Sequence, residues 1–249
     1  IGTQIVRALH VGFLCLLVMM MLPGRWPKLS MLLGVAAMCV GLYQWVYEGE
    51  LIQRSGDLTD LDIVVGVLAV ALVFDCSRRL MGWALPGICA VFLAYAVFGQ
   101  YLPQPLGHRG YAFEQVVEQL AFGLEGIYGL PTYVSSSYIF LFILFGSFLE
   151  SAGMIKLFTD FALGTVGHTR GGPGKVAVVS SGLMGTINGS GVANVVTTGQ
   201  FTIPLMKRFG FSPAFAGGVE ATASMGGQIM PPVMGAVAFI MAETLDMAY

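Results

Sequence analysis

The chain has 249 residues, of which 56% are hydrophobic and only 10% are charged, and its formal net charge is −2. A water-soluble globular domain carries about 25% charged residues, so this composition excludes an ordinary soluble domain. The charge balance does not indicate a nucleic-acid partner, and the isolated cysteines and histidines do not indicate a metal cluster. The few charged residues fall between long apolar runs, which is typical of a polytopic membrane protein.

Five apolar runs are predicted to be membrane helices, because about 20 residues cross the hydrocarbon core of a bilayer. The second run ends in aromatic residues, which favour the membrane interface. No signal peptide is predicted, since the first run lacks a small-residue cleavage site and is followed by more spans. The runs lie at about 8–22, 29–47, 61–76, 81–101 and 133–149.

Basic residues follow the first and third runs, and the segment 48–62 after the second run is acidic. The positive-inside rule therefore places residues 23–28 and 77–80 in the cytoplasm and residues 48–60 outside. The loop 102–131 is then also external. Its apolar residues recur at three- and four-residue spacings, which predicts an amphipathic segment on the membrane, a surface that receives a protein partner, or both. These apolar residues are Phe113, Val116, Val117, Leu120 and Leu124.

The stretch 176–206 has basic residues on both sides, Lys175 before it and Lys207 and Arg208 after it. Two full spans need about 40 residues, and this stretch is too short for them. We therefore predict a re-entrant helix–break–helix hairpin that enters from the cytoplasm and turns at mid-membrane. Irregular backbone at that depth is tolerated only where it is buried in protein or lines a cavity. The polar, glycine-rich centre at 186–194 is therefore a candidate functional site.

A second break is predicted at 226–232, where Pro231 and Pro232 interrupt a glycine-rich helix. Prolines lack N–H donors, so carbonyl groups one turn upstream lose their helical partners. Discontinuous helices are where transporters place ion sites. The alternative is a plain proline kink with glycines that allow close helix packing. Two such breaks in otherwise apolar sequence favour the site.

The segments 185–206 (GTINGSGVANVVTTGQFTIPLM) and 216–243 (AGGVEATASMGGQIMPPVMGAVAFIMAE) resemble signatures of the TRAP (tripartite ATP-independent periplasmic) transporter permeases. Their residues are most similar to those of fused permeases of the TAXI subclass. The resemblance extends back through 82–111 and 138–154 and covers nearly the whole chain. Because the sequence begins with Ile1 and stops after an apolar run, we expect an N-terminal fragment of such a permease.

The resemblance and the apolar pattern together define the expected architecture. We expect an all-α polytopic membrane protein with about seven or eight membrane segments, counting the hairpin 176–206 and the Pro-broken helix at 226–232. The expected parts are small-subunit-like helices at 1–101, an external loop at 102–131 and the N-terminal part of a truncated large transport domain at 132–249. A second, inverted hairpin repeat would lie beyond the sequence.

The resemblance implies a Na⁺-coupled permease in the cell inner membrane, without enzymatic activity or an organic cofactor. It would take an organic acid-type solute from a periplasmic binding protein and work by an elevator mechanism. Carried over by position, the Na⁺ ligands are mostly backbone carbonyls. The tip reads Asn-Gly-Ser-Gly where the family has Ser-Gly-Ser-Ser, so an amide oxygen replaces a hydroxyl. The implied Na⁺ ligands are Asn188, Gly227, Ile229 and Pro232.

Five polar residues near these breaks are candidates for the substrate path. Glu220 lies in an apolar stretch, and a carboxylate at membrane depth is a functional candidate unless it is paired near the interface. Thr197 and Thr198 face the path or bond back to their own helix. Ser190 and Asn194 lie at the hairpin tip and shortly after it.

Two other functions fit parts of the sequence. A passive channel would also bury polar breaks, but it needs a continuous wet pore. An intramembrane serine protease would use Ser190 as its nucleophile, but Asn188 replaces the first glycine of the usual GxSG setting. No histidine follows His168 to serve as the base. The transporter interpretation is therefore favoured.

Overall fold

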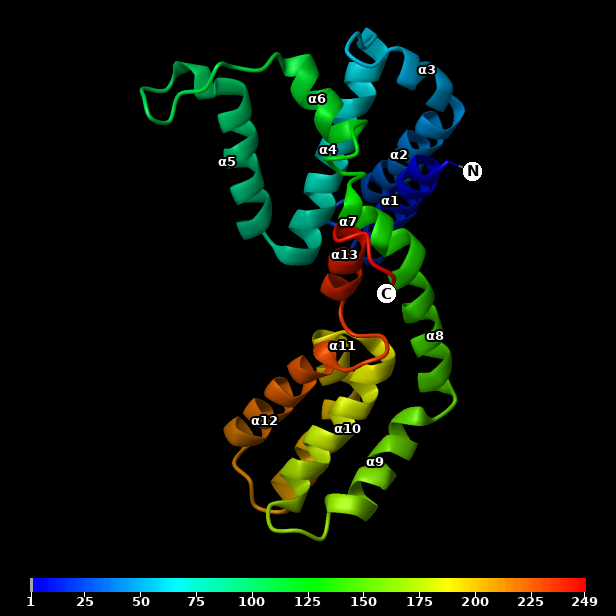
Figure 1. Ribbon diagram of the computed structural model, residues 1–249, viewed down its shortest axis with the longest axis vertical. Coiled ribbons are helices and arrows are strands. Elements are labelled where there is room, and N and C mark those ends of the chain that lie inside the picture. Colours follow the sequence, from blue (N-terminus) through cyan, green and yellow to red (C-terminus); the bar gives the residue numbers. More distant parts are fainter. Residues whose placement is uncertain (1) are drawn as a thin grey trace. The chain divides into compact units, whose positions relative to one another are not determined.

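The computed structural model describes residues 2–249, and the described residues form helices without any strand (Figure 1). The chain divides into two compact units, an N-terminal unit that ends at Ser136 and a C-terminal unit over Ser137–Tyr249. Each unit is held by its own helix packing. The predicted all-α fold is confirmed.

The N-terminal unit is built around two antiparallel apolar helices, α1 and α2. They pack closely because a glycine of one helix lies against the backbone of the other. A Cβ on Gly41 of α2 would lie 2.8 Å from the carbonyl oxygen of Ala8 in α1. Helix α4 packs beside them and buries Ala69, Leu72 and Cys76. The elements of this unit are α1 (Thr3–Met21), α2 (Pro27–Val46), α3 (Glu48–Gln53), α4 (Asp60–Met81), α5 (Ala84–Phe98), η1 (Gly99–Tyr101), α6 (Phe113–Ala121) and α7 (Leu130–Val134).

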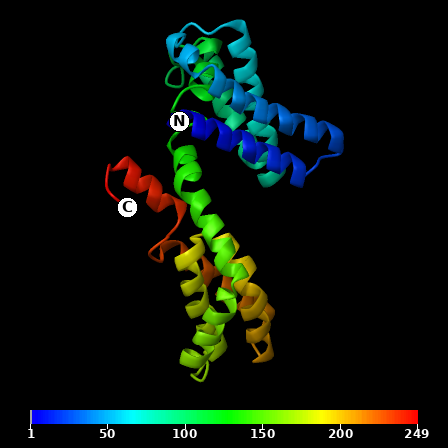
Figure 2. The ribbon, with the colours of Figure 1, turned by 90° about the vertical axis from the view of Figure 1, so that its right-hand side faces the viewer.

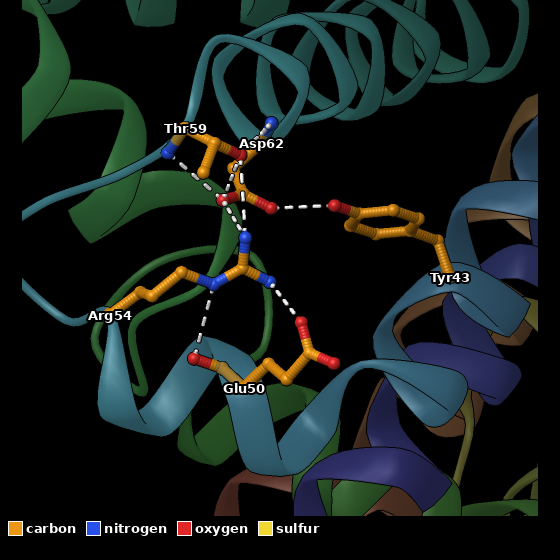
Figure 3. Close-up of polar contacts among 5 residues, drawn as sticks. All are labelled: Tyr43, Glu50, Arg54, Thr59 and Asp62. Atoms are coloured by element: carbon orange, nitrogen blue, oxygen red, sulfur yellow. Dashed lines mark hydrogen bonds and ion pairs between the residues drawn. The ribbon is translucent and has the colours of Figure 1, made fainter.

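The start of α4 is fixed by a buried carboxylate. Thr59 and Asp62 form a capping box, in which the Asp62 N–H donates to the Thr59 hydroxyl oxygen and the Thr59 N–H donates to the Asp62 carboxylate. The Thr59 hydroxyl also donates to this carboxylate. The Tyr43 hydroxyl donates to Asp62 Oδ1 at 2.6 Å, and Arg54 Nη1 lies 3.3 Å from Oδ2 (Figure 3). Asp60 and Asp62, grouped with the acidic loop in the sequence, thus begin a helix, and Asp62 ties the start of α4 to α2 and to Arg54, the residue that follows α3.

The predicted amphipathic segment is the helix α6. Its buried residues Val117 and Ala121 pack against α4, where Gly66 leaves room for Val117. Phe113 and Leu124 remain exposed. Part of the apolar face therefore contacts protein, and contact of the remainder with the membrane surface stays a prediction.

In the C-terminal unit three helices, α9, α11 and α12, pack against α10 (Figure 2). The chain enters α10 through Gly171, whose φ of 71° favours glycine. A π-helical turn, η2 (Ser135–Ile139), precedes α8 without a break in the helical backbone. The other elements are α8 (Phe140–Ser151), α9 (Met154–Val166), α10 (Gly172–Asn188), α11 (Gly191–Arg208), α12 (Pro213–Gly226), η3 (Gly227–Ile229) and α13 (Ala236–Thr244).

Within residues 2–249, four helical segments are long and apolar enough to cross a membrane by length and composition, and they correspond to the first, second, fourth and fifth predicted runs. Helix α4, the third run, has 22 residues but carries charged groups at both ends. The chain is thus a polytopic membrane protein, and the orientation of its loops stays a prediction. The four segments are Thr3–Met21, Pro27–Val46, Ala84–Tyr101 and Leu130–Ser151.

Candidate functional site

The predicted hairpin is present as two antiparallel helices, α10 and α11, joined by a two-residue turn. Helix α10 ends at Asn188, Gly189 adopts a left-handed conformation with φ 57°, and Ser190 caps α11 by accepting the N–H of Ala193. A Cβ on Gly189 would overlap the carbonyl oxygen of Met234, so only glycine fits there. The turn lies inside the predicted break at 186–194, and its depth in a membrane stays a prediction.

The second predicted break is also present. Helix α12 ends at Gly226, a single 3₁₀ turn follows, and irregular backbone continues to the start of α13 at Ala236. Within it, the Met230 N–H donates to the Gly227 carbonyl at 3.2 Å. The Tyr249 hydroxyl lies 2.8 Å from the Pro232 carbonyl oxygen. The interruption therefore extends three residues beyond the predicted 226–232, to residue 235.

The two breaks meet in space. A Cβ on Gly185 would overlap the backbone of Gly227, and a Cβ on Gly191 would lie 2.6 Å from the Met225 sulfur. The turn of the hairpin is therefore held against the second break by contacts that only glycines allow. Gly185, Gly189, Gly191 and Gly227 all lie where a Cβ would be crowded, and their contacts bring the two candidate regions of the sequence side by side.

A cavity of about 660 Å³ opens beside the turn. Its polar lining residues are Asn188, Ser190 and Gln228, and the remaining lining is glycine and apolar side chains from the turn, η2, α8, α13 and the second break. No charged side chain lines it. A ligand here would meet amide, hydroxyl and backbone groups.

The four implied Na⁺ ligands do not all lie at the cavity. Asn188 and Ile229 line the cavity, whereas Gly227 and Pro232 do not. The carbonyl of Gly227 accepts from Met230 N–H, and that of Pro232 accepts from the Tyr249 hydroxyl. The structure therefore brings two of the four to one cavity and gives the other two carbonyls hydrogen-bond partners nearby.

Only one of the two polar atoms of the Asn188 side chain has a hydrogen-bond partner. Its Oδ1 accepts the backbone N–H of Ser190 at 3.2 Å, while its buried Nδ2 has no hydrogen-bond partner. Among the described residues no group of three or more His, Cys, Asp or Glu could hold a metal ion. Neutral amide and carbonyl oxygens are the donors that transporters offer to Na⁺ at broken helices. The amide oxygen of Asn188 is an oxygen of this kind, and a Na⁺ ion at the turn stays a prediction.

Of the five substrate-path residues, only Ser190 lines the cavity. Thr197 and Thr198 both bond back to carbonyls of their own helix, one of the two readings open from sequence. Asn194, Thr198 and Glu220 are fully or almost fully buried. They lie together behind the turn, between the helices, rather than at the cavity.

Glu220 is the centre of that buried group. The hydroxyls of Ser181, Thr198 and Ser224 lie 3.0, 2.5 and 3.0 Å from its Oε1, and the Thr202 hydroxyl bonds to Oε2. Sequence reasoning missed Ser181, Thr202 and Ser224. The available signal was spacing: Thr198 and Thr202, and likewise Glu220 and Ser224, stand four residues apart and so share a helix face.

Comparison with known proteins agrees with the resemblance found in the sequence. The family described as "Tripartite ATP-independent periplasmic transporter, DctM component" matches residues 68–249, which include the hairpin and the second break. No solved structure matches the chain at a significant level.

Curated relatives carry related descriptions. The C4-dicarboxylate TRAP transporter large permease protein DctM of Rhodobacter capsulatus is 37% identical over 103 residues, which are 41% of this chain and 23% of that protein. The protein of the same description from Vibrio cholerae is 29% identical over 179 residues, 72% of this chain and 37% of that protein. The sialic acid TRAP transporter large permease protein SiaM of Vibrio cholerae is 34% identical over 91 residues, 36% of this chain and 21% of that protein. The matched part thus spans well under half of each relative.

Proposed function

The chain belongs to the DctM component family of tripartite ATP-independent periplasmic transporters, and from this we propose that it is part of a Na⁺-coupled permease for an organic acid. The carrying observation is that the two broken-helix segments inside the family match meet at one cavity. In this proposal the permease lies in the cell inner membrane and receives its solute from a periplasmic binding protein.

The chemistry of the cavity supports an ion as part of the mechanism. No charged side chain lines the cavity, so a bound carboxylate finds no fixed cation there. An ion bound at Asn188 and the carbonyls of the second break would supply that positive charge. The chain itself contributes the amide and backbone oxygens that hold the ion, and the glycine contacts that keep the turn in place. The hairpin and α12 would move together as part of a transport domain, as an elevator mechanism requires.

The substrate class rests on the relatives, whose descriptions name C4-dicarboxylates, sialic acid and 2,3-diketo-L-gulonate. All of these are organic acids. We propose a small carboxylate for this protein too. The TAXI subclass indicated by the sequence stays a prediction.

Uptake into proteoliposomes tests the proposal. The full-length protein is reconstituted, a panel of radiolabelled carboxylates is offered with the cognate binding protein, and the Na⁺ gradient is imposed or removed. Accumulation above the outside concentration that needs both the gradient and the binding protein is expected. Passive equilibration that needs neither would identify a channel and would contradict the proposal.

A further inference from the structure

The carboxyl group of Glu220 joins three helices although it is fully buried. Its hydroxyl partners come from α10 (Ser181), α11 (Thr198 and Thr202) and its own helix α12 (Ser224). Gly199 makes room for it, since a Cβ there would lie 3.2 Å from Glu220 Cγ. A buried carboxyl with so many partners is costly to disturb, because each hydroxyl left unpaired loses a hydrogen bond in a low-dielectric setting.

The same network continues from Glu220 to Asn194. The Thr198 hydroxyl, 2.5 Å from Glu220 Oε1, lies 3.3 Å from Asn194 Oδ1. Asn194 Nδ2 donates to the carbonyl of Ser181 at 2.8 Å, which fixes the orientation of the amide. Asn194 is thereby held between α10 and α11.

Asn194 in turn contacts the second break. A Cβ on Gly227 would lie 2.8 Å from Asn194 Nδ2, so the amide packs directly against the Gly227 backbone. Gly227 is an implied ligand, and the next two residues, Gln228 and Ile229, line the cavity. A continuous path of contacts therefore runs from Glu220 through Thr198 and Asn194 to the backbone beside the cavity.

We propose that Glu220 is a positioning residue for the Na⁺ site: it does not touch the ion but sets the place of the Gly227 backbone through Thr198 and Asn194. This inference rests on the proposed function. The requirement is for an acceptor oxygen rather than a charge. The Thr202 hydroxyl lies 3.1 Å from the Thr198 carbonyl and can donate to it. A glutamine amide can then donate to Thr202 while its oxygen keeps the Oε1 contacts.

The experiment measures Na⁺ dependence of uptake by the full-length protein in proteoliposomes at fixed substrate. Glu220→Ala is expected to raise the half-saturating Na⁺ concentration by about threefold or more, with most of the rate recovered at high Na⁺. Glu220→Gln should restore the wild-type value. Thr198→Val should raise the half-saturating Na⁺ concentration in the same way. The double variant Thr198→Val/Glu220→Ala should raise it no further than the larger of the two single changes.

Thr222→Val is the matched control, because the Thr222 hydroxyl also bonds back one turn, to Gly218, but is exposed and outside the network. It should leave Na⁺ dependence unchanged. If Glu220→Ala does not fold, Thr198→Val and Glu220→Gln carry the test. Wild-type Na⁺ dependence in Thr198→Val, or an equal shift in Thr222→Val, would overturn the inference. Uptake by the unaltered protein that ignores Na⁺ would instead remove the proposed function.

Discussion

Gly185 and Gly227 touch backbone to backbone, and a Cβ on either would overlap or crowd the other. This contact brings the last turn of α10 against the start of the 3₁₀ turn that follows α12. It sets how close the hairpin turn lies to the second break, and the neighbouring residues Asn188 and Gln228 line the cavity.

Gly185→Ala is therefore expected to destabilise the C-terminal unit by about 1–3 kcal/mol, because the added methyl has no space in a packed interface. Thermal unfolding of the purified protein in detergent measures the effect. Gly164→Ala on α9 is the control, since nothing lies within 4 Å of a Cβ at that position. It should be neutral or slightly stabilising, because alanine favours a helix more than glycine does. An equal loss in both variants would contradict the contact.

The hairpin topology predicts that both ends of 176–206 face the cytoplasm. Single cysteines replacing Arg170 and Phe209, both exposed, should react with an impermeant maleimide only from the cytoplasmic side. Gly172 is unsuitable for this purpose, because a Cβ there would overlap the carbonyl of Gly167. The background must lack the exposed Cys39 and Cys89. Labelling of either site from outside would refute the hairpin orientation.

Asp62 is expected to stabilise the N-terminal unit. Asp62→Ala removes the capping box and the partners of Tyr43 and Arg54, so a loss of about 1–3 kcal/mol is expected. Thermal unfolding again measures it. Asp60→Asn, at the exposed first residue of the same helix, should change stability by under about 0.5 kcal/mol. Similar losses in the two variants would show that the buried contacts contribute nothing.

Much of this architecture could be predicted from the sequence. The apolar runs became helices because their length and hydropathy leave no other structure in a bilayer. The hairpin turn fell inside 186–194 because Gly189 alone in that segment takes a left-handed conformation after a helix. Helix α9 was not predicted, since its 13 residues carry Lys156 and Asp160 and give no span-length signal.

The candidate site was harder to predict. The resemblance pointed to Asn188 and Ile229, which line the cavity, but no local pattern shows that Gly227 and Pro232 face other partners. Glu220 was singled out as a carboxylate in an apolar stretch. Its proposed positioning role depends on hydroxyls from α10 and α11. Contacts between helices arise from tertiary packing, so the sequence around Glu220 does not show them.

The central claim is that the hairpin turn and the second break form one Na⁺ site. Asn188→Leu keeps a similar side-chain volume but removes the amide oxygen. The half-saturating Na⁺ concentration for uptake is expected to rise roughly tenfold, which corresponds to about 1.4 kcal/mol. Cys39→Ala, on the exposed side of α2, should leave it unchanged.

Uptake by reconstituted Asn188→Leu as a function of Na⁺ concentration is therefore the most direct test. A shifted Na⁺ dependence, with the amount of folded protein retained, is the predicted result. Transport by Asn188→Leu with the wild-type Na⁺ dependence would contradict the account and leave the turn as a packing feature.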